Sequence, residues 1–278
     1  VTVVNVTVQI PGLDPVTELP EVVDKVREIQ AQISSTYPEL EIQLSGMIMM
    51  NASFTESALN DNATLVPLMF VVIALVMVLL LKTISGSIAT MIIVIFSIVS
   101  AMGIAGWMGF FLTSPSASAP TIIITLAVAD CIHILTTFLY EMRHGAEKKP
   151  AIIESLRVNF QPVLLTSVTT AIGFLSMNFS DSPPFRDLGN IVAMGVMLAF
   201  FFSVTLFPAL LCVLPIKVTP EAQRKGDLMA TLADFVIAKK KILFPTSIAV
   251  IIGLFVFVPQ NILNDNFIKY FDETVPFR

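Results

Sequence analysis

The sequence predicts an α-helical polytopic membrane protein with six transmembrane helices and a small extracytoplasmic α+β portion at the N-terminus. The 278-residue chain is 55% hydrophobic and 13% charged, with a mean hydropathy of +0.84, a balance that soluble domains rarely show. Six apolar stretches follow the first 60 residues. Each is long enough to cross a bilayer core of about 30 Å. Before them, the chain mixes polar and apolar side chains as a water-soluble segment does.

The first 60 residues predict a strand, a helix and a second strand. Residues 1–10 are rich in β-branched side chains and end at Pro11-Gly12, a pattern typical of a strand that meets a turn. Apolar residues then recur with helical spacing from Leu19 to Tyr37. A second strand is expected from Glu41 to Met50. Because this strand-helix-strand unit lacks a partner layer, we expect a longer polypeptide to complete it.

The transmembrane part divides into a block of five helices over residues 61–216 and a sixth helix within residues 241–261. A linker, residues 217–240, separates them, and the polar residues 262–278 begin a second extracytoplasmic segment. The apolar stretches are Thr64–Leu81, Ile88–Leu112, Ala119–Tyr140, Phe160–Phe179, Leu188–Leu214 and Ile242–Pro259.

The positions of lysine and arginine predict the orientation. Eleven of the sixteen lie on one side of the predicted spans, around residue 82, within 143–157 and within 217–241. Cytoplasmic loops carry such an excess of basic residues. We therefore expect a multi-pass plasma membrane protein, of a bacterial inner membrane in particular, whose N-terminal portion is extracytoplasmic.

The linker allows two interpretations. A helix starting at Pro220 would place apolar residues on one face and lie on the cytoplasmic membrane interface. Alternatively, the linker is a solvated connector. The apolar face would consist of Leu228, Met229, Leu232, Phe235 and Val236.

Glycines and prolines predict details of the helix packing. Gly173, Gly189 and Gly195 are expected to permit close contact between helices. Pro162 is expected to mark a helix start, and Pro208 a kink near the cytoplasmic side.

Asp130 is the main candidate functional residue, because it lies near the middle of the third apolar stretch. An acidic residue at this depth is costly, normally faces a bundle interior or a water-filled cavity, and marks a functional site by default. A low-dielectric environment disfavours the charged form of a carboxyl group. A carboxyl group of this kind can exchange a proton and bias two packings of a helix bundle. The structural alternative is a hydrogen bond across helices, for example to Thr169 or Thr170.

His133 lies one turn after Asp130 on the same helical face. It is expected to be a second proton-relay residue, one half of a metal site, or a packed histidine. Two ligands without a third do not make a metal site, so no metal is expected. Hydroxyls on the next span, among them Thr166, Thr169 and Thr170 as relay support and Ser167 beside them, either assist Asp130 or hold helices together.

The sequence resembles a known family in three segments: LAVADCIHILTTFLYEMRHG (126–145), EKKPAIIESLRVNFQPVLLTSVTTAIGFLSM (147–177) and FRDLGNIVAMGVMLAFFFSVTLFPALL (185–211). They resemble resistance-nodulation-cell division (RND) exporters of the mycobacterial-membrane-protein-large (MMPL) type, whose five-helix block is related to the sterol-sensing domain. The resemblance implies that residues 1–60 are part of an outer porter subdomain and that Asp130 is the proton-relay carboxylate. Many relatives have a second acidic residue where this chain has Ala129.

The resemblance implies a transporter that uses the proton motive force to export a lipid or other hydrophobic substrate. Its expected partners are the bilayer, the substrate, protons and a second half of the same polypeptide. We expect no enzyme activity, no cofactor and no nucleic acid, because no phosphate-binding loop, metal-binding cysteine pair or catalytic triad is recognisable. The alternatives are a sterol-sensing-like sensor or scaffold that transports nothing, and an accessory of protein secretion from the same superfamily.

Overall fold

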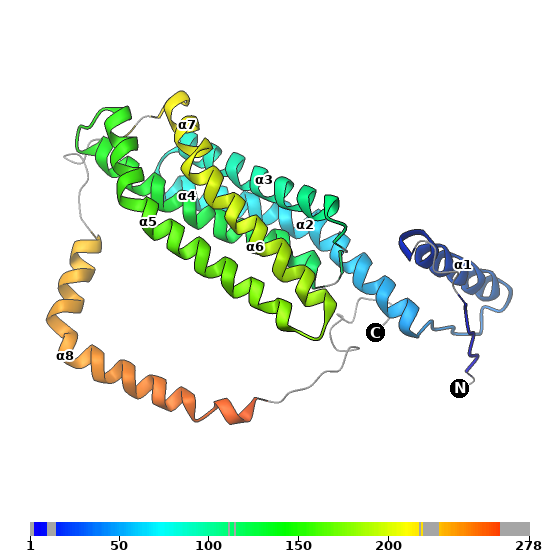
Figure 1. The fold of residues 1–278 in the computed structure, drawn as a ribbon. Coiled ribbons are helices and arrows are strands. Elements are labelled where there is room, and N and C mark those ends of the chain that lie inside the picture. The colour runs from blue at the N-terminus through cyan, green and yellow to red at the C-terminus, as the bar shows by residue number, and fades with distance from the viewer. Residues whose placement is uncertain are drawn as a thin grey trace. The chain divides into compact units, whose positions relative to one another are not determined.

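The computed structural model describes residues 3–9, 15–110, 112–113, 115–216, 218 and 228–261. Within these residues it is helical, without strands, and six helical segments are long and apolar enough to cross a membrane. The chain divides after Val218 into two units (Figure 1). The elements are α1 (Pro15–Thr36), α2 (Met47–Leu81), α3 (Ile84–Trp107), η1 (Ser116–Ser118), α4 (Ala119–Arg143), α5 (Lys148–Leu175), η2 (Ser176–Phe179), α6 (Pro183–Val204), α7 (Leu206–Val213), α8 (Leu228–Phe255) and η4 (Val258–Gln260).

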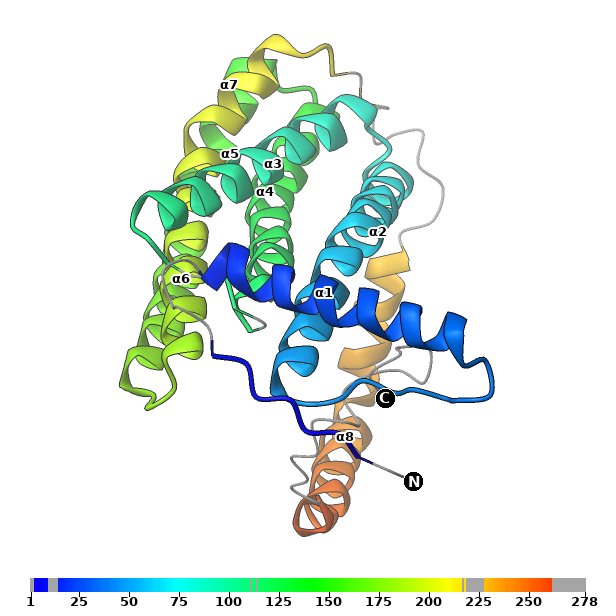
Figure 2. The ribbon, with the colours of Figure 1, turned by 90° about the vertical axis from the view of Figure 1, so that its right-hand side faces the viewer.

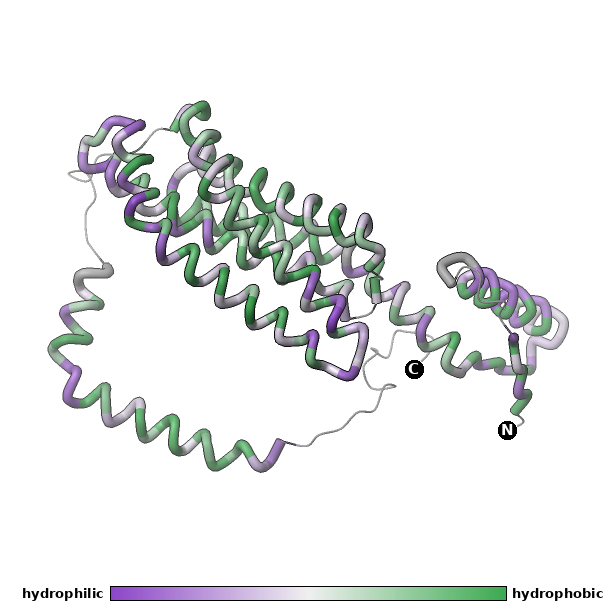
Figure 3. Tube along the Cα trace, in the orientation of Figure 1, coloured by the Kyte–Doolittle hydropathy of each residue, from purple (hydrophilic) through white to green (hydrophobic). Residues whose placement is uncertain are grey.

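Helices α3 to α6 form the bundle of the first unit, and α4 packs against α3, α5 and α6 (Figures 1 and 2). Of the six spans, α4 is the most deeply buried. Its inward face carries Ile123, Ala127, Cys131, Leu135 and Phe138, all of them fully buried. The connections from α4 to α5 and from α5 to α6 are mostly hydrophilic, whereas the middles of the bundle helices are mostly hydrophobic (Figure 3), as expected for helices that cross a membrane.

Two of the three glycines predicted to permit close packing do so. A Cβ atom at Gly195 of α6 would overlap the side chain of Ile123 on α4. One at Gly189 would overlap the carbonyl oxygen of Phe174 on α5. The expectation was wrong for Gly173, where a Cβ would meet no described atom within 4 Å.

The α2–α3 connection is a tight turn at the expected cytoplasmic end. Lys82 adopts the left-handed conformation, with φ of 56°, and its N–H donates to the carbonyl of Val78. Thr83 then caps α3, because its hydroxyl oxygen accepts a hydrogen bond from the N–H of Gly86. Helix α2 has 35 residues, about 52 Å at 1.5 Å per residue, whereas about 20 residues suffice to cross the hydrocarbon core.

The prediction of two N-terminal strands was wrong. Residues 3–9 form no strand, and α2 already begins at Met47, inside the expected second strand Glu41–Met50. Val3, Val4 and Val6 are 71–84% exposed. A β-branched segment needs a neighbouring strand and a surface to cover, and the described residues supply neither. The helix expected at Leu19–Tyr37 is confirmed as α1.

The helices around the apolar stretches differ from the predicted spans mainly at their ends. Helix α5 begins at Lys148, so Pro162 lies inside it and does not start it. The fifth stretch is interrupted at Thr205 between α6 and α7. The kink predicted at Pro208 explains this break, because proline has no N–H to donate to the carbonyl of Val204.

In the second unit, α8 continues from the linker into the sixth apolar stretch as one helix, with Pro245 inside it. The predicted helix start at Pro220 and the second extracytoplasmic segment, residues 262–278, lie outside the described residues. From Thr231 onward the residues of α8 are almost all exposed.

Candidate functional site

Asp130 lies near the middle of α4 with its side chain directed into the first unit. It is 6% exposed and lies beside the fully buried Ala127 and Cys131. The sequence produces this placement because α4 runs from Ala119 to Arg143 without interruption, so Asp130 falls on the face whose other members are small or apolar. A charged group in such a position requires several hydrogen bonds or a cation to offset its lost hydration.

Ser167 on α5 supplies one hydrogen bond to this carboxyl group. Its hydroxyl donates to Oδ2 of Asp130 at 3.2 Å, and the residue is 2% exposed. A single neutral donor at this distance satisfies a small part of the acceptor capacity of a carboxylate. The hydroxyl of Ser167 therefore links α5 to α4 but offsets only part of the cost of burying a carboxylate.

The structure places the other predicted relay residues away from this contact. His133 is exposed on α4, and Thr170 is half-buried on α5. The hydroxyl of Thr166 donates to the carbonyls of Pro162 and Val163, and that of Thr169 to the carbonyls of Leu165 and Thr166. Their participation in a relay stays a prediction. The described residues contain no group of three or more His, Cys, Asp or Glu that could hold a metal ion.

Sequence reasoning missed two further polar residues between α4 and α5. Asn159 donates through Nδ2 to the hydroxyl of Thr137 at 2.8 Å and to the carbonyl of Ser155 at 2.8 Å. Ser155 donates to the carbonyl of Ile134 at 2.6 Å. The signal was present, because Ser155, Asn159 and Ser167 fall on one row of α5 at multiples of four residues. We call this set, with Asp130 and Thr137, the α4–α5 seam.

A model of the MMPL family matches residues 2–237. The chain belongs to the MMPL family. The matched region contains the whole bundle and the α4–α5 seam. Among known proteins, the chain is also similar to the one named Putative membrane protein MJ1562 of Methanocaldococcus jannaschii. The two are 24% identical over 211 residues, which cover 76% of this chain and 54% of that protein. The chain thus spans about half the length of the curated relative it matches.

In this MMPL family member, basic residues fix the end of the bundle that we expect to be cytoplasmic. Nη2 of Arg143, at the end of α4, donates to the carbonyl of Leu81, the last residue of α2, at 2.9 Å. Nζ of Lys148, at the start of α5, donates to the carbonyls of Cys212 and Leu214 around the end of α7, at 2.8 and 2.6 Å. Cations at helix C-termini satisfy free carbonyls and complement the helix dipole. The loop between α4 and α5 is thereby connected to two other helices.

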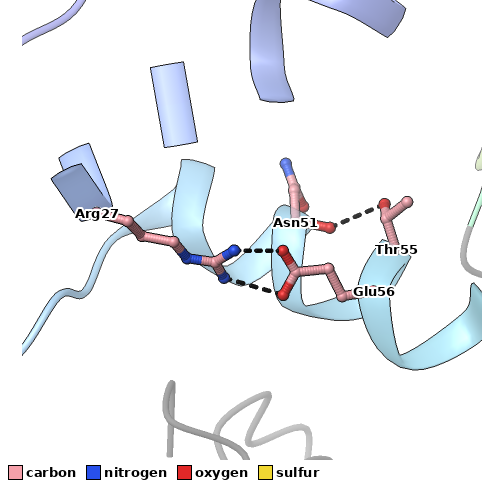
Figure 4. A network of polar contacts seen from close by, with 4 residues as sticks. All are labelled: Arg27, Asn51, Thr55 and Glu56. Atoms are coloured by element: carbon pink, nitrogen blue, oxygen red, sulfur yellow. Dashed lines mark hydrogen bonds and ion pairs between the residues drawn. The ribbon is translucent and has the colours of Figure 1, made fainter. Parts of the chain in front are cut away.

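At its other end, α2 is held to α1 by an ion pair. The guanidinium of Arg27 donates to both carboxylate oxygens of Glu56, at 2.6 and 2.9 Å (Figure 4). These hydrogen bonds raise the pKa of Arg27. Because the side chains of this pair are 41% and 51% exposed, it orients α1 on α2 more than it stabilises the fold.

Proposed function

We propose that the chain is part of an RND-type exporter that is driven by the proton motive force and moves a lipid or other hydrophobic molecule outward. In this proposal Asp130 takes up and releases the transported proton. The observation that carries it is the burial of this carboxyl group in the central helix of an MMPL family bundle, with the hydroxyl of Ser167 as its hydrogen-bond donor. Acidic residues in such positions mark proton relays in pumps and transporters.

Protonation of Asp130 would change the α4–α5 contact physically. A carboxylate only accepts hydrogen bonds, whereas a carboxylic acid also has one to donate. Uptake of a proton removes a buried charge and frees Asp130 to donate to another group. A difference of a few kcal/mol between the two states is enough to shift a conformational equilibrium by orders of magnitude.

Three of the other predicted relay residues lie on the surface of the first unit. His133, Thr166 and Thr169 are exposed at the depth of apolar spans, where polar side chains normally face protein or water. We propose that a second half of the same polypeptide covers them and that His133 then serves as a further relay station. The N-terminal portion is proposed to be extracytoplasmic, on the basis of the lysine and arginine distribution.

Proton flux in proteoliposomes tests the proposal. The full-length protein is reconstituted, a pH gradient is imposed, and an internal dye follows the pH for wild type, Asp130→Asn and the control Asp61→Asn. The control makes the same chemical change at an exposed position of α2. We expect Asp130→Asn to abolish the protein-dependent flux and Asp61→Asn to retain it. Equal flux in all three, with equal folding and insertion, would reject the proton-driven mechanism and favour the sensor, scaffold or secretion-accessory alternatives.

A further inference from the structure

The α4–α5 seam contains a second polar cluster, separate from Asp130 and Ser167. Asn159 is 7% exposed and uses both hydrogens of its Nδ2 within the bundle, for Thr137 and for the carbonyl of Ser155. Its carbonyl oxygen keeps its acceptor capacity. The Thr137 hydroxyl also donates, to the carbonyl of His133 at 3.3 Å. An amide at this position is costly in a membrane span unless a partner or water satisfies it.

This cluster lies between Asp130 and the expected cytoplasmic end of the bundle. Thr137 follows Asp130 by seven residues on α4, about 10 Å along the axis at 1.5 Å per residue. Asn159 precedes Ser167 by eight residues on α5, and the two helices are antiparallel in the register that both hydrogen-bonded pairs define. Helix α4 ends at Arg143, less than two turns beyond Thr137.

An apolar layer separates the two polar clusters. Ile134 on α4 and Val163 on α5 occupy the intervening positions of the same register, and each is 1% exposed. Val163 belongs to the row that also contains Asn159 and Ser167. A proton that leaves Asp130 toward the cytoplasm between α4 and α5 must pass this layer, and the side chains of Ile134 and Val163 hold no group that could carry it.

We infer that Asn159 and Thr137 form a station on the proton route between Asp130 and the cytoplasm, and that Ile134 and Val163 form the barrier between station and relay. This inference rests on the proposed function. Asn159 is not protonated; it positions water by accepting from it, and each water takes up one proton as it passes another on. The barrier opens when water enters the layer, so transfer through the bundle depends on the packing of α4 against α5.

The first test uses the full-length protein in proteoliposomes with Asn159→Leu and Asn159→Ser. Leucine removes every polar atom at the station, whereas serine retains a hydroxyl that can hold water. We expect Asn159→Leu to lower the proton flux per folded protein by about a hundredfold, the lower end of the range for a group that assists proton transfer. Asn159→Ser should stay close to wild type. If Asn159→Leu changes thermal stability but leaves the flux per folded protein at the wild-type value, Asn159 is only a structural residue and the inference is wrong.

The second test adds a hydroxyl to the barrier. Val163→Thr preserves the side-chain shape while it places a polar group between station and relay. Val192→Thr makes the same exchange at a fully buried position of α6, outside the seam. We expect Val163→Thr to increase the proton flux above wild type and Val192→Thr to leave it unchanged. Equal flux in both variants would contradict the barrier.

Asp130→Asn, measured in the same assay, distinguishes a failure of the proposed function from a failure of the proposed proton route. If it retains wild-type flux, the proposed function and the route fail together. If it abolishes the flux while Asn159→Leu and Val163→Thr behave as wild type, only the route is overturned.

Discussion

Helix α4 contacts α6 and α5 in two different ways. Against α6 the contact is apolar and tight, since Gly195 leaves room for no more than the side chain of Ile123. Against α5 it is polar, with hydrogen bonds from Ser155, Asn159 and Ser167 to the carbonyl of Ile134, the hydroxyl of Thr137 and the carboxyl group of Asp130. Close packing of apolar groups has one arrangement, whereas hydrogen bonds between helices can exchange partners at small cost. The difference indicates that the α4–α6 contact fixes the position of α4. Under the proposed function, the α4–α5 seam is where a change of protonation acts.

The largest expected effect comes from breaking the tight contact. Gly195→Leu should destabilise the bundle by about 3 kcal/mol, the upper part of the usual range for overpacking, because the new side chain must displace Ile123. Gly173→Leu is the matched control on α5, where a Cβ meets no described atom within 4 Å. Unfolding of the purified protein in detergent measures both. Equal destabilisation by the two substitutions would show that the close contact between α4 and α6 does not fix the position of α4.

The polar seam should contribute less per contact. A double-mutant cycle with Thr137→Ala and Asn159→Ala is expected to give a coupling free energy of about 0.6 to 1.7 kcal/mol, as for other hydrogen bonds between membrane helices. The same unfolding measurement provides the four free energies. A coupling energy near zero would mean that the Asn159–Thr137 hydrogen bond does not hold α4 to α5.

The contact of Lys148 with the end of α7 is polar, like the α4–α5 seam, but it lies at the end of the bundle and not between two helices. Lys148→Met removes the ammonium group that bonds the carbonyls of Cys212 and Leu214 and should cost about 1 kcal/mol. Lys149→Met, at the exposed neighbouring position, should have almost no effect. Thermal unfolding of both variants distinguishes a specific contact from a general effect of charge, which would appear equally in the two.

The smallest effect is expected for the exposed ion pair between α1 and α2. Removing it with Arg27→Ala and Glu56→Ala should reveal a coupling energy below about 1 kcal/mol that decreases as salt is added, since exposed ion pairs are screened. The double-mutant cycle is measured at low and high ionic strength. A coupling energy that is independent of salt would indicate that this pair is desolvated and structurally more important than its exposure suggests.

The sequence predicted the membrane spans well, but it predicted the helix ends, the N-terminal segment and the hydrogen-bond partner of Asp130 poorly. The reasons are physical. Long apolar runs identify membrane helices because the hydrocarbon core favours apolar side chains on a backbone that satisfies its own hydrogen bonds. The helices nevertheless extend beyond the apolar residues, as α5 does by beginning at Lys148. Residues 3–9 have the composition of a strand, but the part of the chain that the structure describes contains no strand to pair with them. Periodicity places Ser167 on one row of α5 with Ser155 and Asn159, but it does not tell which row of α5 faces α4. Ser167, and none of Thr166, Thr169 and Thr170, is the one hydrogen-bonded to Asp130, because the rotation of α5 against α4 decides which side chain points inward.

The most direct measurement of the central claim is the protonation change of Asp130 itself. Infrared difference spectra of the reconstituted full-length protein, recorded between acidic and alkaline pH, report the carbonyl band of protonated carboxyl groups. We expect one such band in wild type and in Asp61→Asn that is absent in Asp130→Asn and shifted in Ser167→Ala, which lacks the hydroxyl donor. Identical difference spectra for wild type and Asp130→Asn would show that Asp130 does not exchange a proton, and the proposed mechanism would be wrong.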